Sequence, residues 1–280
     1  MRNQLLDLIR DTSCDLPAES EAVLQPDSEA HGSPAQATLE QICRNVAIAR
    51  QGDRPICQDT GTLSFFFNLP DGTKVLPIAQ AAREAVREAT ANGWLRNNTI
   101  ETLSGRSIND NVLAPHAPVL HFDFNDQGTS EVTLLMKGGG SENMSCQYTL
   151  PDSTLKANRN LDGVRKCILD AVNRIQGQGC APGALGVCIG GDRAEGYAAA
   201  KRQLLRQQGE RASDPDLAAF EMRLLKEANS LGIGPMGLGG KVTLTDIRIT
   251  ALPRLPASYF VTIAYLCWAA RRRTRIFRIG

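Results

Sequence analysis

The chain has 280 residues, with 31 Lys and Arg against 30 Asp and Glu, so its formal net charge is +1. A hydrophobic content of 42% suits a globular protein, and the near-neutral charge disfavours a dedicated nucleic-acid binder. No apolar run approaches the ~18 residues of a membrane span, and the N-terminus lacks the apolar core of a secretory signal. We therefore expect a cytoplasmic protein without a nucleic-acid or membrane partner.

The first half of the chain predicts three helices and three strands. Apolar residues recur at helical spacing over residues 1–12 and 38–49, and residues 77–94 form a strongly amphipathic pattern that ends near Gly93. Between the first two helices, residues 16–36 are rich in Pro, Ser, Glu and Ala, which is typical of a surface connection or mobile loop. Strands are predicted at residues 63–67, 119–124 and 132–137, with the turn NDQG between the last two.

The second half predicts three further helices and three further strands. The helical patterns cover residues 161–175, 194–207 and 217–229, and the strand patterns cover residues 184–191, 242–249 and 259–266. We expect a mixed α/β (α+β) fold in which long helices pack around a mixed sheet, with the site at the loop ends of the elements. The arginine-rich end, residues 271–280, predicts a solvated or interface tail.

Four loop segments concentrate groups that can carry chemistry, and one of them is the tight Gly/Pro loop GQGCAPG, which carries Cys180. The segment PICQDTGT places a thiol, an amide, a carboxylate and hydroxyls directly before an apolar strand, although an ordinary Asp-Thr-Gly turn or an aspartic-protease motif would also explain it. The segment KGGGSENMS brings backbone N–H groups, Lys137, Ser141 and Asn143 together as a candidate anion cradle, the alternative being a flexible turn. The glycine run from Gly232 to Gly240, followed by Lys241, is a second candidate anion loop.

The eight cysteines are scattered through the chain, and no Cys-x-x-Cys pair occurs among them. This pattern excludes a dense disulfide scaffold and a zinc ribbon. Cys57, Cys180 and Cys267 differ from the other five because each lies where an apolar element meets a polar or glycine-rich loop. If the fold brings them together, three thiolates could hold an iron–sulfur cluster and leave one iron open to substrate. From spacing alone, a buried structural role for each cysteine is the favoured interpretation.

Five segments in this order resemble the class I fumarase/L(+)-tartrate dehydratase family: PICQDTGT, KGGGSENMS, GCAPGALGVCIGGDRAEGYAAAK, GIGPMGLGGK and YLCWAARR. The resemblance extends from about residue 36 to about residue 272. We accordingly divide the chain into a variable N-terminal segment, residues 1–35, and an iron–sulfur hydro-lyase α-subunit domain, residues 36–280. The resemblance implies a 4Fe–4S enzyme that reversibly hydrates a small dicarboxylate, most simply fumarate to (S)-malate, together with a separate β subunit in two αβ pairs.

The resemblance also implies roles for individual residues. Cys57, Cys180 and Cys267 would be the cluster ligands. Gln58 and Asp59 would face the open iron, with Asp59 as the proton-transfer group. Arg96 and the backbone at Gly140 would bind substrate. The base that removes the carbon-bound proton would lie in the β subunit.

The sequence leaves three alternatives to consider. The first is a different substrate, L(+)-tartrate or mesaconate. The second is an inactive subunit that binds a cluster and serves in assembly. A zinc protein is disfavoured, because the three cysteines have no local pair and no suitable histidine. Cys146 and Cys188 depart from the family pattern and receive no role.

Overall fold

The computed structural model describes residues 1–277 and separates into two compact units. Unit 1 contains residues Met1–Ala18 and Cys43–Gly139 together with the chain from Ala269 onward, and unit 2 contains Glu19–Ile42 and Gly140–Trp268. The chain therefore leaves unit 1 and returns to it twice. None of the helices in the described part of the chain is long and apolar enough to cross a membrane.

Unit 1 is built on a four-stranded mixed sheet with the order β10-β5-β1-β4. Its strands are β1 (Thr62–Pro70), β4 (Val119–Asn125), β5 (Glu131–Lys137) and β10 (Arg272–Ile276). Strand β1 pairs in parallel with β4 and antiparallel with β5, so it lies between the two strands that the NDQG turn connects. The three strands predicted in this half of the sequence are confirmed.

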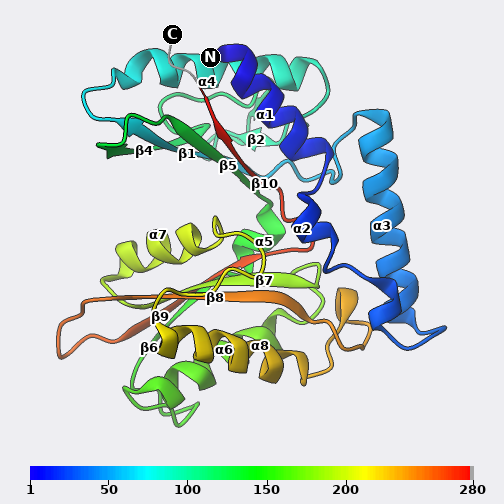
Figure 1. Cartoon of the computed structure of the whole chain (residues 1–280), viewed down its shortest axis with the longest axis vertical. Helices are drawn as coiled ribbons and strands as arrows, with labels where there is room; N and C mark the ends of the chain where they lie inside the picture. Colours follow the sequence, from blue (N-terminus) through cyan, green and yellow to red (C-terminus); the bar gives the residue numbers. More distant parts are fainter. Residues whose placement is uncertain (278–280) are drawn as a thin grey trace. The chain divides into compact units, whose positions relative to one another are not determined.

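Two helices, α1 (Arg2–Cys14) and α4 (Val75–Ala91), pack together on the sheet of unit 1 (Figure 1). Their apolar faces and the side chains of β1 form one core, in which Leu5, Phe65 and Val86 are fully buried. Helix α4 stops just before Gly93, whose φ of +76° suits a residue without a Cβ. Both helices agree with the apolar spacing of the sequence.

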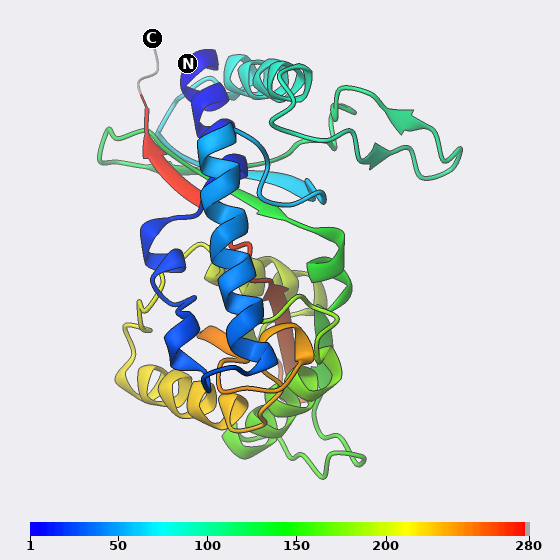
Figure 2. The same ribbon diagram turned by 90° about the vertical axis from the view of Figure 1, so that its right-hand side faces the viewer.

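A small hairpin formed by β2 (Thr99–Ile100) and β3 (Ser107–Ile108) extends away from the sheet of unit 1 (Figure 2). The loop segments on either side of this hairpin carry Arg96 and Asn111, which belong to the candidate site described below. Helix α3 (Pro34–Gly52) begins in unit 2 and ends in unit 1, and it confirms the helix predicted over residues 38–49.

Unit 2 contains a second four-stranded mixed sheet, with the order β6-β9-β7-β8. Its strands are β6 (Cys146–Thr149), β7 (Gly183–Gly190), β8 (Leu244–Leu252) and β9 (Phe260–Leu266). Helix α7 (Arg193–Gln203) covers one face, while α6 (Leu161–Ile175) and α8 (Pro215–Asn229) cover the other (Figure 1). The mixed α/β class is confirmed, with the strands divided between two mixed sheets.

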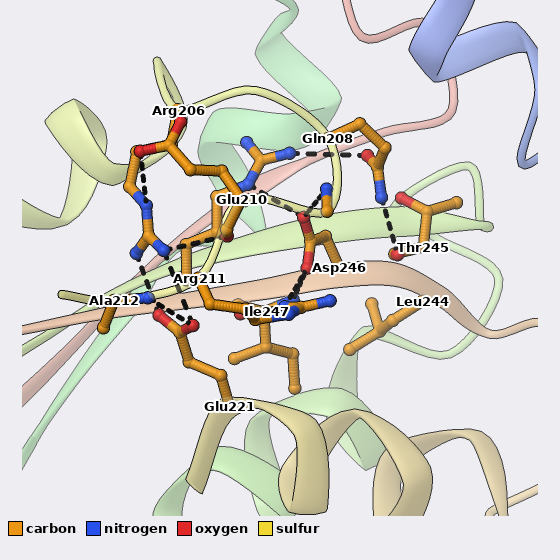
Figure 3. Close-up of polar contacts among 12 residues, drawn as sticks. Arg206, Gln208, Glu210, Arg211, Ala212, Glu221, Leu244, Thr245, Asp246 and Ile247 are labelled. Atoms are coloured by element: carbon orange, nitrogen blue, oxygen red, sulfur yellow. Dashed lines mark hydrogen bonds and ion pairs between the residues drawn. The ribbon is translucent and has the colours of Figure 1, made fainter. Parts of the chain in front are cut away.

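A buried ion-pair network fixes the loop after α7 to strand β8 (Figure 3). The fully buried carboxylate of Asp246 accepts from Arg248 at 3.0 Å and from Arg211 at 2.7 Å. Glu221 of α8 is also fully buried and accepts from Arg206 at 2.8 Å. Because each buried charge has an opposite charge in contact, the cost of removing it from water is offset.

The N-terminal connection is more ordered than its composition suggests. Residues 16–36 contain a short helix α2 (Ala18–Glu21) and a 3₁₀ turn η1 (Pro26–Ser28), and Leu16, Leu24 and Glu29 are buried. Regular elements and buried side chains were not part of the prediction of a surface connection or mobile loop. The apolar and acidic side chains of this segment find partners far away in the sequence, which local composition does not reveal.

The predicted arginine-rich tail is also largely an ordered strand. Residues Arg272–Ile276 form β10, which pairs antiparallel with β5, and the Oγ1 atoms of Thr274 and Thr133 lie 2.8 Å apart across the pair. Arg273 and Arg275 form ion pairs with Asp15 and Asp11. Residues 278–280 of the predicted tail lie outside the described residues.

Candidate functional site

The loop that leads into β1 holds the carboxylate of Asp59 in one orientation. Oδ1 accepts from the backbone N–H of Gly61 at 2.9 Å and from the side-chain amide of Asn98 at 3.3 Å. Oδ2 accepts from the N–H of Gly139 at 2.7 Å. With both oxygens engaged, the carboxylate is oriented before any ligand arrives.

Two glycines allow this loop to lie against the end of β5. A Cβ on Gly61, whose φ is +71°, would lie 2.4 Å from the carbonyl oxygen of Lys137. A Cβ on Gly138 would lie 2.7 Å from Oδ2 of Asp59. The absence of side chains at these positions therefore brings PICQDTGT and KGGG, two of the motifs found in the sequence, into direct contact.

Arg96 is tied to the same loop through its backbone. Its N–H donates to Oγ1 of the buried Thr60 at 2.8 Å, and its carbonyl accepts from Nδ2 of Asn111 at 2.8 Å. The Arg96 side chain is exposed, so the backbone is fixed while the guanidinium is free to reach a ligand. Asn111 is almost fully buried and also accepts, through Oδ1, the N–H groups of residues 98 and 99.

A cavity of about 330 Å³ opens beside Asp59 within unit 1. Its lining includes Asn98, Asn111 and His116 as well as Asp59. Sequence reasoning assigned none of the first three, because they lie in the irregular segment around the small hairpin, where no periodic pattern or motif marks them. This volume accommodates a small dicarboxylate, and the lining offers amide, imidazole and carboxylate groups for polar contacts.

Unit 2 brings the loops of Cys180 and Cys267 together. The N–H of Trp268 donates to the carbonyl of Cys180 at 3.2 Å, and the N–H of Cys267 donates to Oγ of the buried Ser141 at 3.2 Å. Ser141 belongs to α5 (Gly139–Asn143), the short helix formed by the KGGGSEN motif. Cys180 is exposed and has a φ of +53°, whereas Cys267 is partly buried.

The glycine run at residues 232–240 does not form a free anion loop. The buried carboxylate of Glu29 accepts the N–H of Lys241 at 2.8 Å and that of Val242 at 2.8 Å. The prediction of a second anion site for a ligand is wrong, because the chain supplies the anion itself. The loop instead supports the Cys180 loop, since the N–H of Met236 donates to the carbonyl of Ala181 at 2.9 Å.

Tyr265 of β9 lies beneath the Cys180 loop. A Cβ on Gly179 would lie 2.5 Å from its ring, and a Cβ on Gly183 would lie 2.2 Å from its hydroxyl oxygen. Burial raises the pKa of the phenol well above its usual value, and the nearby thiols of Cys267 and Cys180 add to this rise. The hydroxyl is buried and has no hydrogen-bonding partner among residues 1–277.

Four of the remaining cysteines have environments that favour the protonated thiol. Burial raises the pKa of Cys14 and of Cys167 to about 12 and that of Cys188 to about 11. The pKa of Cys146 is also raised, mainly by burial. Because the thiolate is the form that binds metal, these four are poor candidates for ligands.

The chemistry of the donor set fits an iron–sulfur centre. Cys180 and Cys267 lie on adjacent loops, a buried hydroxyl without a partner lies beneath them, and the sulfur of Cys57 accepts the N–H of Asp59 at 3.4 Å. No three His, Cys, Asp or Glu side chains of the described chain are already grouped to hold a metal ion. Cys57 belongs to unit 1 and the other two cysteines to unit 2, so the three-cysteine centre stays a prediction.

Comparison with known proteins identifies the family. The model of the fumarate hydratase (Fumerase) family matches residues 2–276. The chain therefore belongs to the fumarate hydratase family, which confirms the resemblance found in the sequence. The match begins at residue 2, so it includes the N-terminal segment in which the sequence showed no family motif.

Three similar proteins illustrate the range of this family. A Geobacillus stearothermophilus protein named "Putative fumarate hydratase class I" is 42% identical over 95% of this chain and 52% of its own length. A Methanocaldococcus jannaschii protein named "Putative L(+)-tartrate dehydratase subunit alpha" is 31% identical over 98% of this chain and 96% of its own. The L(+)-tartrate dehydratase subunit alpha of Escherichia coli K12 is 30% identical over 82% of this chain and 75% of its own length. The chain thus spans about half the length of the Geobacillus protein.

Proposed function

We propose that this chain is the α subunit of an iron–sulfur hydro-lyase that reversibly hydrates fumarate to (S)-malate, working in the cytoplasm. The observation that carries the proposal is the Asp59 carboxylate, which three N–H donors orient beside a cavity of small-dicarboxylate size. Fumarate is favoured over tartrate because identity to the relative named as a fumarate hydratase is higher, at 42% against 31% and 30%.

We assign Cys57, Cys180 and Cys267 as the ligands of a 4Fe–4S cluster. A cluster with three protein ligands supplies a Lewis-acidic iron that weakens the carbon–oxygen bond of the substrate hydroxyl. The high pKa values of Cys14, Cys167 and Cys188 support this choice, because those thiols keep their protons.

The chain's own residues bind the substrate and move one proton. The exposed guanidinium of Arg96 pairs with a substrate carboxylate, while Thr60 and Asn111 hold its backbone. Gln58, exposed beside Asp59, and the backbone N–H of Gly140 supply further hydrogen bonds to the substrate. In the hydration direction, the Asp59 carboxylate takes a proton from the attacking water, and in the dehydration direction the resulting carboxylic acid returns a proton to the departing hydroxyl, which leaves as water.

The proton on carbon is removed by a base outside this chain, in a β subunit. Two relatives are named as alpha subunits, which supports a heteromeric enzyme. The alignment with the Geobacillus protein leaves about half of that protein unmatched, and this half is the counterpart we expect the partner to supply. We expect two αβ pairs in the assembly.

Anaerobic coexpression with the β subunit, followed by assay of fumarate, L(+)-tartrate and mesaconate, tests this function. We expect fumarate to give the highest kcat/KM and the α chain alone to be inactive. Asp59→Asn should lower kcat by 10²- to 10⁴-fold without reducing the iron content. Asp126→Asn, in the exposed turn after β4, is the control and should keep wild-type activity. Wild-type turnover by Asp59→Asn would overturn the role of Asp59.

The second candidate function is dehydration of L(+)-tartrate. It is favoured by a specific observation, since the chain matches 96% of the length of the Methanocaldococcus α subunit. A higher kcat/KM for tartrate than for fumarate in the same assay would establish it and leave the chemistry proposed for Asp59 unchanged.

A further inference from the structure

The hydroxyl of Tyr265 is a buried polar group that the proposed function does not use. Tyr265 is 1% exposed, and its oxygen has no hydrogen-bonding partner among the described residues. A buried hydroxyl without a partner costs about 1–3 kcal/mol, whereas phenylalanine would fill the same space without this cost. This donor is therefore expected to meet an acceptor that the chain itself does not provide.

Local packing fixes where this hydroxyl lies. Gly179 and Gly183 flank Cys180, and side chains at either position would collide with the phenol. Tyr265 also belongs to the same apolar core as Ile175 at the end of α6, and a Cβ on Gly179 would lie 2.7 Å from Cγ2 of Ile175. The hydroxyl thus lies beneath the loop that carries Cys180 and has little freedom to turn elsewhere.

Both proposed cluster ligands of unit 2 lie near this phenol. Cys267 follows Tyr265 by two residues and packs against the same apolar core. Cys180 is joined to the Cys267 loop by the hydrogen bond from Trp268 N–H to its carbonyl. The two thiols are close enough to act electrostatically on the phenol.

Sulfur atoms of iron–sulfur clusters accept hydrogen bonds, and these bonds are one means by which a protein sets the reduction potential. We propose that Tyr265 is a positioning residue that donates its phenolic hydrogen to a sulfur of the cluster, either a cysteine thiolate or a bridging sulfide. The proposal rests on the cluster assigned under the proposed function. The hydrogen bond stabilises the more negative, reduced cluster and therefore raises its potential.

The test compares Tyr265→Phe with wild type in the anaerobically reconstituted αβ complex. We expect unchanged iron and sulfide content, a reduction potential shifted to a more negative value, and severalfold faster bleaching of the cluster in air. Tyr259→Phe is the matched control, because Tyr259 is 8% exposed in the same core and lies under Arg254. Its potential should equal that of wild type.

A spectroscopic measurement on wild type identifies the bond directly. The reduced cluster in D₂O should show a hyperfine-coupled exchangeable deuteron, which persists in Tyr259→Phe and is absent from Tyr265→Phe. Absence of such a deuteron from the wild-type cluster contradicts the bond even if Tyr265→Phe loses its iron.

Two results would overturn the proposal. One is a fully loaded Tyr265→Phe complex with the wild-type potential and the wild-type deuteron signal. The other is a wild-type complex that turns over substrate with no iron bound, which removes the cluster and this hydrogen bond but leaves the hydro-lyase activity standing.

Discussion

The orientation of the Asp59 carboxylate depends on two glycines that lie next to it, Gly138 and Gly139. Gly138 leaves room for Oδ2, and the N–H of Gly139 holds that oxygen at 2.7 Å. A proton-transfer group has to reach a defined substrate atom, and a displacement of about 1 Å can cost about 100-fold in rate. Small additions at these glycines should therefore affect turnover more than they affect folding.

Gly138→Ala places a methyl group 2.7 Å from Oδ2 of Asp59 and should displace the carboxylate. We expect kcat of the αβ enzyme to fall by about 100-fold, with little change in the urea midpoint. Gly139→Ala is the matched control, because its Cβ would lie 3.8 Å from the same oxygen and its N–H is retained. Equal activity of the two variants would show that this close approach does not position Asp59.

The helices and strands of this chain can be predicted from the sequence where each packs a single apolar face against a hydrophobic core, because such a face leaves a periodic pattern. Helix α6 covers residues 161–175 as expected, and β7 and β9 match the apolar runs. The segments that escaped prediction are stabilised by partners distant in the sequence. Strand β10 pairs with β5 about 140 residues earlier, and Glu29 binds the N–H groups of Lys241 and Val242.

The residues of the candidate site also fall into two groups, those that the sequence revealed and those that only the structure revealed. Crowding of chemically active side chains in one short loop pointed to Cys57 and Asp59, whereas Arg96 came only from the resemblance to a known family. Asn111 and Tyr265 could not be found from the sequence, because a lone amide or phenol carries no local signal. Their importance comes only from the groups that the fold places around them.

Charged side chains buried between elements should contribute much more to stability than exposed ones. Glu221→Ala removes the acceptor for Arg206 and for the backbone N–H of Ala212 (Figure 3). It also removes the acceptor for the backbone N–H of Ile249. We expect the free energy of unfolding to fall by about 3–5 kcal/mol, measured by urea denaturation.

Glu210→Ala is the control for this network. Glu210 is half exposed and lies 3.7 Å from the same arginine, so its loss should cost less than about 1 kcal/mol. Similar losses in the two variants would argue against a special contribution from the buried pair.

At the scale of the whole molecule, the buried thiols make the free energy of unfolding decrease as the pH rises in the alkaline range. Cys14, Cys167 and Cys188 have pKa values near 12, 12 and 11 in the folded chain, against 9.0 for an unperturbed thiol. The folded state therefore keeps protons that the unfolded state loses above pH 9. This stabilisation is complete below pH 9 and is lost as the pH rises through the folded values.

Between pH 8 and pH 10, the free energy of unfolding should fall by about 1 kcal/mol for each such thiol, within the limit of about 1.4 kcal/mol per pH unit. Cys188→Ala removes one of them, so its pH-dependent loss should be about 1 kcal/mol smaller than that of wild type. Urea denaturation under reducing conditions at the two pH values measures this difference. Parallel losses in both proteins would mean that Cys188 ionises equally in the folded and unfolded states.

The division of the chain between the two units has a consequence for its synthesis on the ribosome. Unit 1 takes its first helix from residues 2–14 and its edge strand from residues 272–276, while all of unit 2, residues 19–42 and 140–268, precedes that strand in the chain. A nascent polypeptide can complete unit 2 first, but the sheet of unit 1 must wait until β10 has left the exit tunnel. Cys267 emerges only shortly before that strand, so the cluster proposed above would be inserted at the end of translation or later.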